Sequence, residues 1–223
     1  MKRLFMGTLS AILFLILFAI VAWTYGVGQG GTTIRVSVAS DGTEGDGQSY
    51  YAAISADGQS VVFDSDATTL VSNDSNGERD IFVHDRPTHQ TLLVSVATDG
   101  TPSNGFSEFA TLSGNGQVVV YHSDATNLVS DDTNGVRDVF AYDRATGITT
   151  RLSAAGDGTE GNASSARPVV SEEGRVVAFY SDASNLVSDD TNSATDVFVH
   201  DRMTGITTRI SVASDGRQGV AIR

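Results

Sequence analysis

A segment that recurs three times at a fixed spacing is the feature that most constrains the fold of this chain. The stretch "SNDSNGERDIFVHDR" at 72–86 returns as "SDDTNGVRDVFAYDR" at 130–144 and as "SDDTNSATDVFVHDR" at 188–202, so the period is 58 residues. Such a period is typical of architectures in which each unit is one supersecondary motif that packs on its neighbours. Because a catalytic centre is normally single, a feature present in three copies is first interpreted as architecture.

Each repeat contains four short strand-like runs separated by turn residues. In the middle repeat they are Phe106–Leu112, Gln117–His122, Asp138–Tyr142 and Ile148–Ser153. The second and third runs are apolar on both faces, as expected for covered strands, and Pro168 in the first run of the next repeat fits an edge strand. The pattern predicts an all-β fold of three tandem four-stranded antiparallel β-propeller blades, which form a partial or open propeller.

The last hairpin of each repeat carries a turn signal. Gly147 and Gly205 stand where a hairpin requires a residue in the left-handed conformation, and His89 takes that place in the first repeat. Glycine adopts a positive φ without steric cost, so we expect the same turn in all three copies.

The first repeat resembles a known family. "ISADGQSVVFDS" followed by "RDIFVHDRPTHQTLLVS" is similar to the repeat of TolB- and tricorn-type β-propellers, the WD-like blades of exported bacterial proteins. The matching positions are Ser55, Asp57, Gly58, Val61–Phe63, Asp80, Phe82 and Asp85, and the resemblance covers about residues 32–214. It implies the blade type, while propellers as a class serve both binding and catalysis.

The repeat also predicts the organisation of the chain. We expect a signal peptide or membrane anchor at 1–23, a Gly-rich linker at 24–31, and blades at about 41–98, 99–156 and 157–214, with an extra outer strand at 32–40 and the start of a truncated fourth repeat at 215–223. Closed propellers take about four to eight blades. Three blades therefore predict self-association that completes a ring, with an uncovered face on the first blade, at "VVFDS" and "DIFVHD".

The N-terminus predicts export. Residues 4–23 contain no charge and follow Lys2 and Arg3, and about 20 apolar residues suffice to span a bilayer. The positive-inside rule places the rest of the chain outside the cytoplasmic membrane, in the periplasm or at the cell surface. We expect an uncleaved anchor that places residues 4–23 in the membrane, with a cleaved signal peptide as the alternative.

Composition excludes several partners and chemistries. The chain has 27 acidic and 14 basic residues, a net charge of −13, and no cysteine. An acidic surface repels phosphate backbones, so nucleic-acid binding is not expected. Without cysteine there is no disulfide and no thiolate nucleophile or metal ligand.

The recurring acidic loop raises the question of calcium, the one cofactor considered. An EF-type loop counted with Gly135 at position six puts Ala141 at position twelve, where a bidentate glutamate belongs, so that motif is excluded. A looser site remains a hypothesis, and the alternative is that these residues cap their own turns. The candidate ligands are Asp74, Asn76 and Asp80, with Asp132, Asn134 and Asp138, and Asp190, Asn192 and Asp196 in the later repeats.

No catalytic motif occurs, and no catalytic residue is assigned. We therefore expect a non-enzymatic binding or scaffold module whose acidic long-loop face, formed by the connections Val38–Ser49 and Asp66–Arg79 and their 58-residue equivalents, contacts a protein, a glycan or an envelope component. The alternatives are a propeller-type enzyme that acts on glycans with loop carboxylates as acid and base, and a calcium-binding surface repeat protein.

Overall fold

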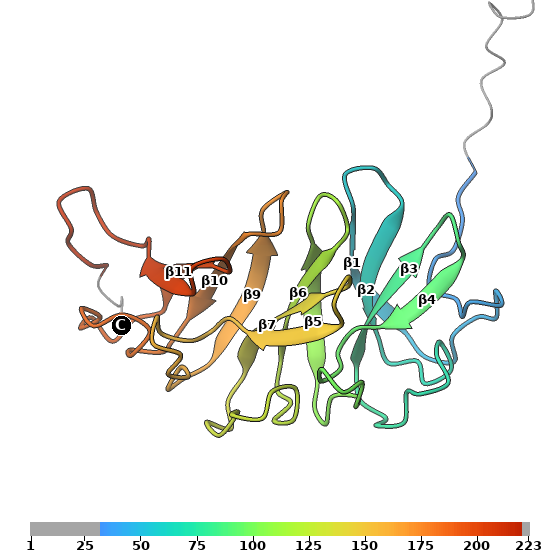
Figure 1. Cartoon of the computed structure of the whole chain (residues 1–223), viewed down its shortest axis with the longest axis horizontal. Coiled ribbons are helices and arrows are strands. Elements are labelled where there is room, and N and C mark those ends of the chain that lie inside the picture. The colour runs from blue at the N-terminus through green and yellow to red at the C-terminus, as the bar shows by residue number, and fades with distance from the viewer. Residues whose placement is uncertain (1–31, 220–223) are drawn as a thin grey trace, which may run out of the picture. The chain divides into compact units, whose positions relative to one another are not determined.

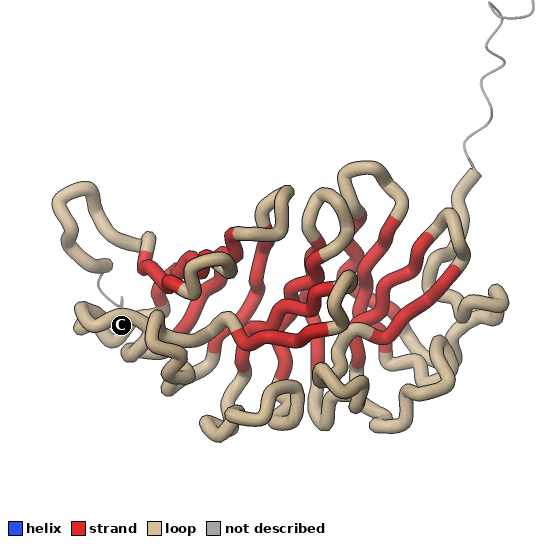
Figure 2. The backbone as a smooth tube through the Cα atoms, viewed as in Figure 1, coloured by secondary structure: helices blue, strands red, loops and turns tan. Residues whose placement is uncertain are grey.

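The computed structural model describes residues 32–219, which contain twelve β-strands in three four-stranded antiparallel sheets (Figure 1). The chain divides into two units at Arg35, and every sheet lies in the unit that begins at Val36. Figure 2 shows only strands and connecting segments in the described range. The three sheets are the blades, and the sequence-based prediction of a partial β-propeller is confirmed.

The strands follow the 58-residue period. The first blade consists of β1 (Ser49–Ile54), β2 (Ser60–Ser65), β3 (Asp80–Asp85) and β4 (Gln90–Leu93). The second consists of β5 (Ser107–Leu112), β6 (Val118–Ser123), β7 (Asp138–Asp143) and β8 (Ile148–Arg151). The third consists of β9 (Ser165–Val170), β10 (Val176–Ser181), β11 (Asp196–Asp201) and β12 (Ile206–Arg209).

Strands that are consecutive in sequence are neighbours in each sheet, so each blade is a simple meander. Connections then alternate between the two ends of the sheets: the short turns lie at one end, and the long connections lie at the other (Figure 1). Pro168 lies on β9, an edge strand, as predicted. The expected left-handed turn is also present, with φ of 72° at Gly147, 71° at Gly205 and 57° at His89.

The core lies between the blades. One apolar cluster joins the first blade to the second, and a second cluster joins the second blade to the third. The first contains Val62, Ile81, Val83 and Val94, packed on Ala110, Leu112, Val119, Tyr121, Ala125, Leu128 and Phe140. The second contains Val118, Val120, Val139, Ala141 and Leu152, packed on Val177, Phe179, Ala183, Leu186 and Phe198. The middle strands of the second blade therefore have apolar side chains packed against a neighbouring blade on both faces, as their apolar sequences predict.

The expected outer strand at 32–40 is not formed. Within that segment Val38 makes only an isolated bridge to Glu44. Thr91 holds the segment in place, because its hydroxyl donates to the carbonyl oxygen of Val38 and its N–H donates to Ser40 Oγ at 3.0 Å. A strand needs a neighbouring strand to pair with, and no strand precedes β1 in the described range. The segment at 32–40 therefore stays irregular, although its sequence is similar to the one that forms β12 in the third blade.

The uncovered sheet face lies on the third blade and not on the first. In the first blade Phe63 and Phe82 are 2% and 0% exposed, in a cluster with Leu70 from the following connection. On the third blade Val197 and Ile210 are 40% and 51% exposed. Their equivalents in the second blade, Val139 and Leu152, are 0% and 1% exposed because the third blade covers them. The long connection covers the side toward the preceding repeat, whereas the opposite side depends on the next blade.

The exposed face of the third blade predicts self-association of the chain from residue 32 onward. Changing Val197→Glu together with Ile210→Glu should abolish it, because burying the exposed half of these two side chains stabilises an interface by about 1.5–3 kcal/mol in all, and two carboxylates reverse that gain. Light scattering measures the oligomer. Met203→Glu is the control, since Met203 is 78% exposed in a hairpin turn. A monodisperse monomer before any substitution would contradict the prediction.

Candidate functional site

The structure brings the predicted ligand residues together within each repeat. Asn134 Nδ2 donates to Asp138 Oδ2 at 2.8 Å, and the equivalent distances are 2.7 Å from Asn76 to Asp80 and 3.0 Å from Asn192 to Asp196. A serine hydroxyl at the end of the outer strand donates to the other oxygen of the same aspartate. These serines are Ser95, Ser153 and Ser211. We call this arrangement of aspartate, asparagine and serine the loop clip.

The loop clip of the second repeat ties three segments of the chain together, the last of them in the connection to the third blade. Ser153 Oγ also accepts the N–H of Val139 at 3.0 Å, so it joins the end of the outer strand to the start of β7. Asn134 Nδ2 also donates to the carbonyl oxygen of Gly161 at 3.0 Å, in the following connection. Burial raises the pKa of Asp138, and the hydrogen bonds from Ser153 and Asn134 oppose that rise. The hydrogen bonds of the loop clip therefore hold the long connection against the sheet.

The remaining predicted ligands lie beside an arginine in two repeats. Asp190 Oδ1 lies 3.0 Å from Arg209 Nη1, and Asp132 Oδ1 lies 3.8 Å from Arg151 Nη1. The first repeat has Leu93 at the position of these arginines. Asp74, which is 8% exposed, has neither a counter-ion nor a hydrogen bond of good geometry, although the backbone N–H of Asn76 partly lowers its pKa. The first repeat thus contains a buried carboxyl group that its sequence leaves uncompensated.

Removal from water, reinforced by the charge of Asp80, raises the pKa of Asp74 to about 6. An unfolded aspartate titrates near about 3.9, so folding favours the protonated form. The stabilising contribution is fully present below about pH 4 and is lost as the pH rises through about 6. Ionised Asp74 therefore destabilises the fold at neutral pH.

We expect Asp74→Asn to raise the free energy of unfolding at pH 8 by on the order of 1–2 kcal/mol and to change it little at pH 4. Urea denaturation across this pH range gives the measurement. Asp131→Asn is the control, since that side chain is 71% exposed. Parallel pH profiles for Asp74→Asn and the parent chain would contradict the assignment.

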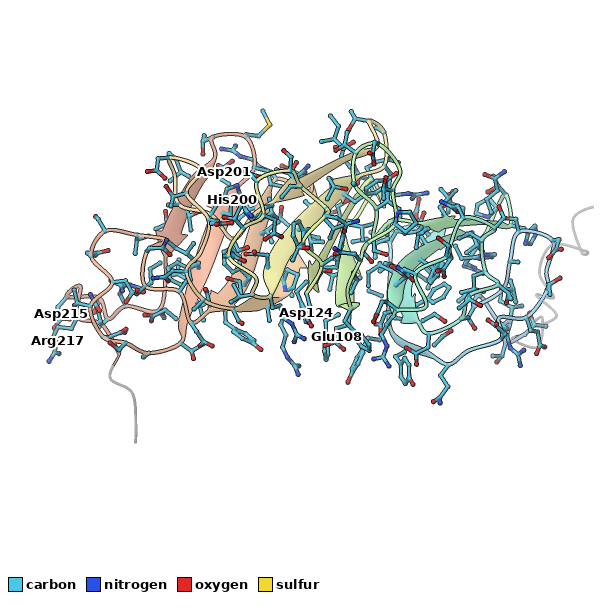
Figure 3. All side chains as sticks on the ribbon, turned by 90° about the horizontal axis from the view of Figure 1, so that it is seen from below. Glu108, Asp124, His200, Asp201, Asp215 and Arg217 are labelled. Carbon is cyan, nitrogen blue, oxygen red and sulfur yellow. The ribbon has the colours of Figure 1, made fainter. Side chains whose placement is uncertain are left out.

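A second polar cluster, centred on Glu108 of β5, was not predicted from the sequence. Glu108 Oε1 lies 3.3 Å from His122 Nε2 and 3.6 Å from Arg137 Nη1, and its Oε2 lies 3.5 Å from Arg79 Nη1. Figure 3 shows Glu108 close to Asp124, which pairs with Arg137 at 2.8 Å. Arg79 belongs to the first repeat and the others to the second, so the cluster joins two blades.

His122 in this cluster is held neutral. Its Nδ1 accepts the backbone N–H of Arg167 at 3.1 Å, so its proton is on Nε2 and points to Glu108. Burial, with help from the charge of Arg137, lowers the pKa of His122 to about 4 against the opposing effect of Glu108. Because both ring nitrogens are engaged, the imidazole has no free lone pair for proton transfer. The one available signal was a break in the repeat: Glu108 stands where the other copies have Tyr50 and Ala166.

Calcium binding at the loop clips stays a prediction. Within residues 32–219 no group of three or more His, Asp or Glu side chains is arranged to hold a metal ion. The clip asparagines direct their NH₂ groups toward the carboxylates, which is the geometry of hydrogen bonding. The first repeat is the most favourable location for a cation, because Asp74 has no arginine beside it.

A calcium site at these loops predicts a higher melting temperature at millimolar calcium, because a ligand that binds only the folded state stabilises it. Asp132→Asn combined with Asp190→Asn should remove the increase for sites in the second and third repeats, and Asp74→Asn should remove it for the first. Thermal melts in calcium and in chelator measure the effect. Identical melting curves would reject calcium at all three loops.

The predicted N-terminal elements lie outside the described residues, and so do the last four residues. In the described range no helix is long and apolar enough to cross a membrane. The anchor or signal peptide at 1–23 and the linker at 24–31 therefore stay predictions.

No family model matches the sequence, and no curated protein matches it. Among solved structures, TolB from Acinetobacter baumannii aligns with a TM-score of 0.47 and 22% identity, over 79% of this chain and 35% of that chain. The tricorn protease aligns with a TM-score of 0.45 and 15% identity, over 69% of this chain and 14% of that chain.

An oligogalacturonate lyase in complex with manganese aligns with a TM-score of 0.47 and 14% identity, over 75% of this chain and 42% of that chain. This chain thus spans less than half the length of each of these three proteins. At these identities the likeness concerns the fold alone. The class of protein that the strands define is a partial β-propeller of three blades.

Proposed function

We propose that this chain is a non-enzymatic binding module that presents its long-loop face to a partner outside the cytoplasmic membrane. The observation that supports this proposal is a row of equivalent exposed carboxylates in the connections. Asp41, Asp99 and Asp157 each accept the N–H of the threonine two residues on, at 2.9 Å in every case. These hydrogen bonds lower the pKa of each aspartate, so the row stays ionised well into the acidic range.

The opposite end of the blades uses its carboxylates differently. Arg144 Nη2 lies 2.6 Å from Asp85 Oδ2, and Arg202 Nη2 lies 3.7 Å from Asp143 Oδ2, so arginines from one blade neutralise aspartates of the preceding blade. At the short-turn end, arginines of the chain itself therefore neutralise part of the acidic charge, whereas the aspartates of the row at the long-loop end face solvent. Charge complementarity favours a partner with a basic surface, such as a lysine-rich segment of an envelope protein.

The repetition of the row also favours binding over catalysis. An array of equivalent charges makes contacts of similar strength, whereas a glycan hydrolase or lyase needs one carboxylate pair at a defined separation. The cluster that does break the repeat engages both nitrogens of His122 internally. The enzyme alternative therefore predicts one dominant loop aspartate, and the binding module predicts graded and similar contributions.

We expect the triple variant Asp41→Asn, Asp99→Asn and Asp157→Asn to bind a fluorescent lysine-rich peptide about tenfold more weakly at low ionic strength. Three exposed charge contacts contribute about 0.2–1 kcal/mol each, and about 1.4 kcal/mol is a factor of ten. Fluorescence anisotropy measures the affinity. The matched control changes the same number of charges at the short-turn end: Asp57→Asn, Glu172→Gln and Glu173→Gln.

Equal weakening by both triple variants would show that the peptide responds to net charge alone, and it would contradict a binding role for the long-loop face. If substitution of a single loop aspartate abolished binding, and the chain also turned over an oligosaccharide, the enzyme alternative would replace the binding-module hypothesis. If the chain bound a neutral glycan on an array, and both triple variants bound it as well as the parent chain does, the partner would be a neutral glycan and not a basic surface.

A further inference from the structure

The first strand of every blade contains a β-bulge at the same position. The pairing of β1 with β2 shifts between Tyr50 and Ala53, and the equivalent shifts occur in the second and third blades. The bulged residues Tyr51, Phe109 and Arg167 have φ of 20°, 56° and 51°. A positive φ is rare and costly for bulky side chains. Three different residues nevertheless adopt it, and no glycine relieves the strain.

The bulges bring the three side chains into one row. The rings of Tyr51 and Phe109 have centroids 4.0 Å apart, and Arg167 Cζ lies 4.3 Å from the centroid of Phe109. The row borders a cavity of about 270 Å³, which we call the inner-strand pocket. It is lined by residues 51–53, 109–111 and 167–169, three from the first strand of each blade. Tyr51 and Val169 are 55% and 57% exposed, so the pocket is open to solvent.

Arg167 differs from the other arginines that surround it. Arg79 and Arg137 pair with aspartates at 2.7 and 2.8 Å, in a chain whose net charge is −13. The guanidinium of Arg167 forms no ion pair and no hydrogen bond with any residue from 32 to 219. Its backbone N–H donates to His122 Nδ1, which fixes the bulge from the second blade. An exposed guanidinium that stacks on Phe109 and has no ion pair among residues 32–219 is thus presented to a largely apolar pocket.

This chemistry defines a ligand class. A guanidinium binds a carboxylate through two parallel hydrogen bonds. The rings of Tyr51 and Phe109 face each other and Arg167 lies over Phe109, so a flat apolar group in the pocket would meet ring edges, in the edge-to-face arrangement that aromatic groups favour. Besides Arg167 and the hydroxyl of Tyr51, the lining has one polar side chain, Thr111, whose hydroxyl donates to the carbonyl oxygen of Pro168 at 3.4 Å, so the pocket has few groups that would recognise the hydroxyls of a sugar ring. We infer that the inner-strand pocket binds a small planar carboxylate, with its ring against Tyr51 and Phe109 and its carboxylate on Arg167. This site is separate from the carboxylate row of the long-loop face.

Isothermal titration of the full chain with indole-3-acetate tests the inference. We expect saturable binding to one site, and Arg167→Gln should weaken it about tenfold or more, because a charge-assisted hydrogen bond contributes about 1.5–3 kcal/mol. The neutral analogue indole-3-acetamide should bind the parent chain as weakly as the acid binds the Arg167→Gln variant. Arg167→Lys should recover part of the affinity for the acid.

Two further variants separate the pocket from general effects on the fold. Tyr51→Ala removes an exposed ring, and it should weaken the acid and the amide by the same factor. Arg175→Gln is the matched control, because Arg175 is exposed and pairs with Asp201 in the third blade, and it should leave the affinity unchanged. Unchanged melting temperatures verify that the variants fold. No saturable binding of indole-3-acetate, or equal affinity in the parent and Arg167→Gln chains, would overturn the inference.

Discussion

Packing of one blade on the next is the interaction on which the rest of the structure depends. The two middle strands of each blade are apolar on both faces, and the blade's own long connection covers only the side toward the preceding repeat, so the other side must be covered by the next blade. Val62 and Ile81 of the first blade are 0% exposed because they pack on the cluster of the second blade that contains Tyr121 and Phe140. The same contact is built again between the second and third blades from the equivalent residues. Stacking therefore places the connections of all repeats at common ends, and it makes a row of carboxylates from one aspartate per repeat.

Much of the fold could be predicted from the sequence because its signals are local and repeated. Apolar runs between turn residues placed β7 at its observed start, Asp138, and the glycines at 147 and 205 marked turns that do have positive φ. The expectation for residues 32–40 was wrong because strand formation depends on a neighbour as well as on the sequence of the segment. The uncovered face was assigned to the wrong blade for a similar reason. The covering role of Leu70 is a tertiary contact that no local pattern reveals.

The candidate sites were predicted less completely. The loop residues of each repeat do lie together, as in the hydrogen bond from Asn134 to Asp138, but the pattern alone could not show that the amide would turn its NH₂ group to the carboxylate. Glu108 and Arg167 were missed because neither belongs to a motif. Both stand at positions whose residue type changes from copy to copy. In a repeat protein the shared residues describe the scaffold, so individual chemistry is best sought where the copies disagree.

The open face of the third blade has a consequence for the order in which the chain loses structure. In a linear array, the stability of each unit depends on its own folding free energy and on the contacts with its neighbours. The second blade is covered on both faces, whereas Val197 and Ile210 leave the third blade covered on one. In the isolated chain, disassembly should therefore begin at the C-terminal blade and proceed toward the N-terminus. Backbone amide protons at equivalent positions of the three blades would then exchange at different rates, because the rate depends on the place of the blade in the array and not on its similar sequence.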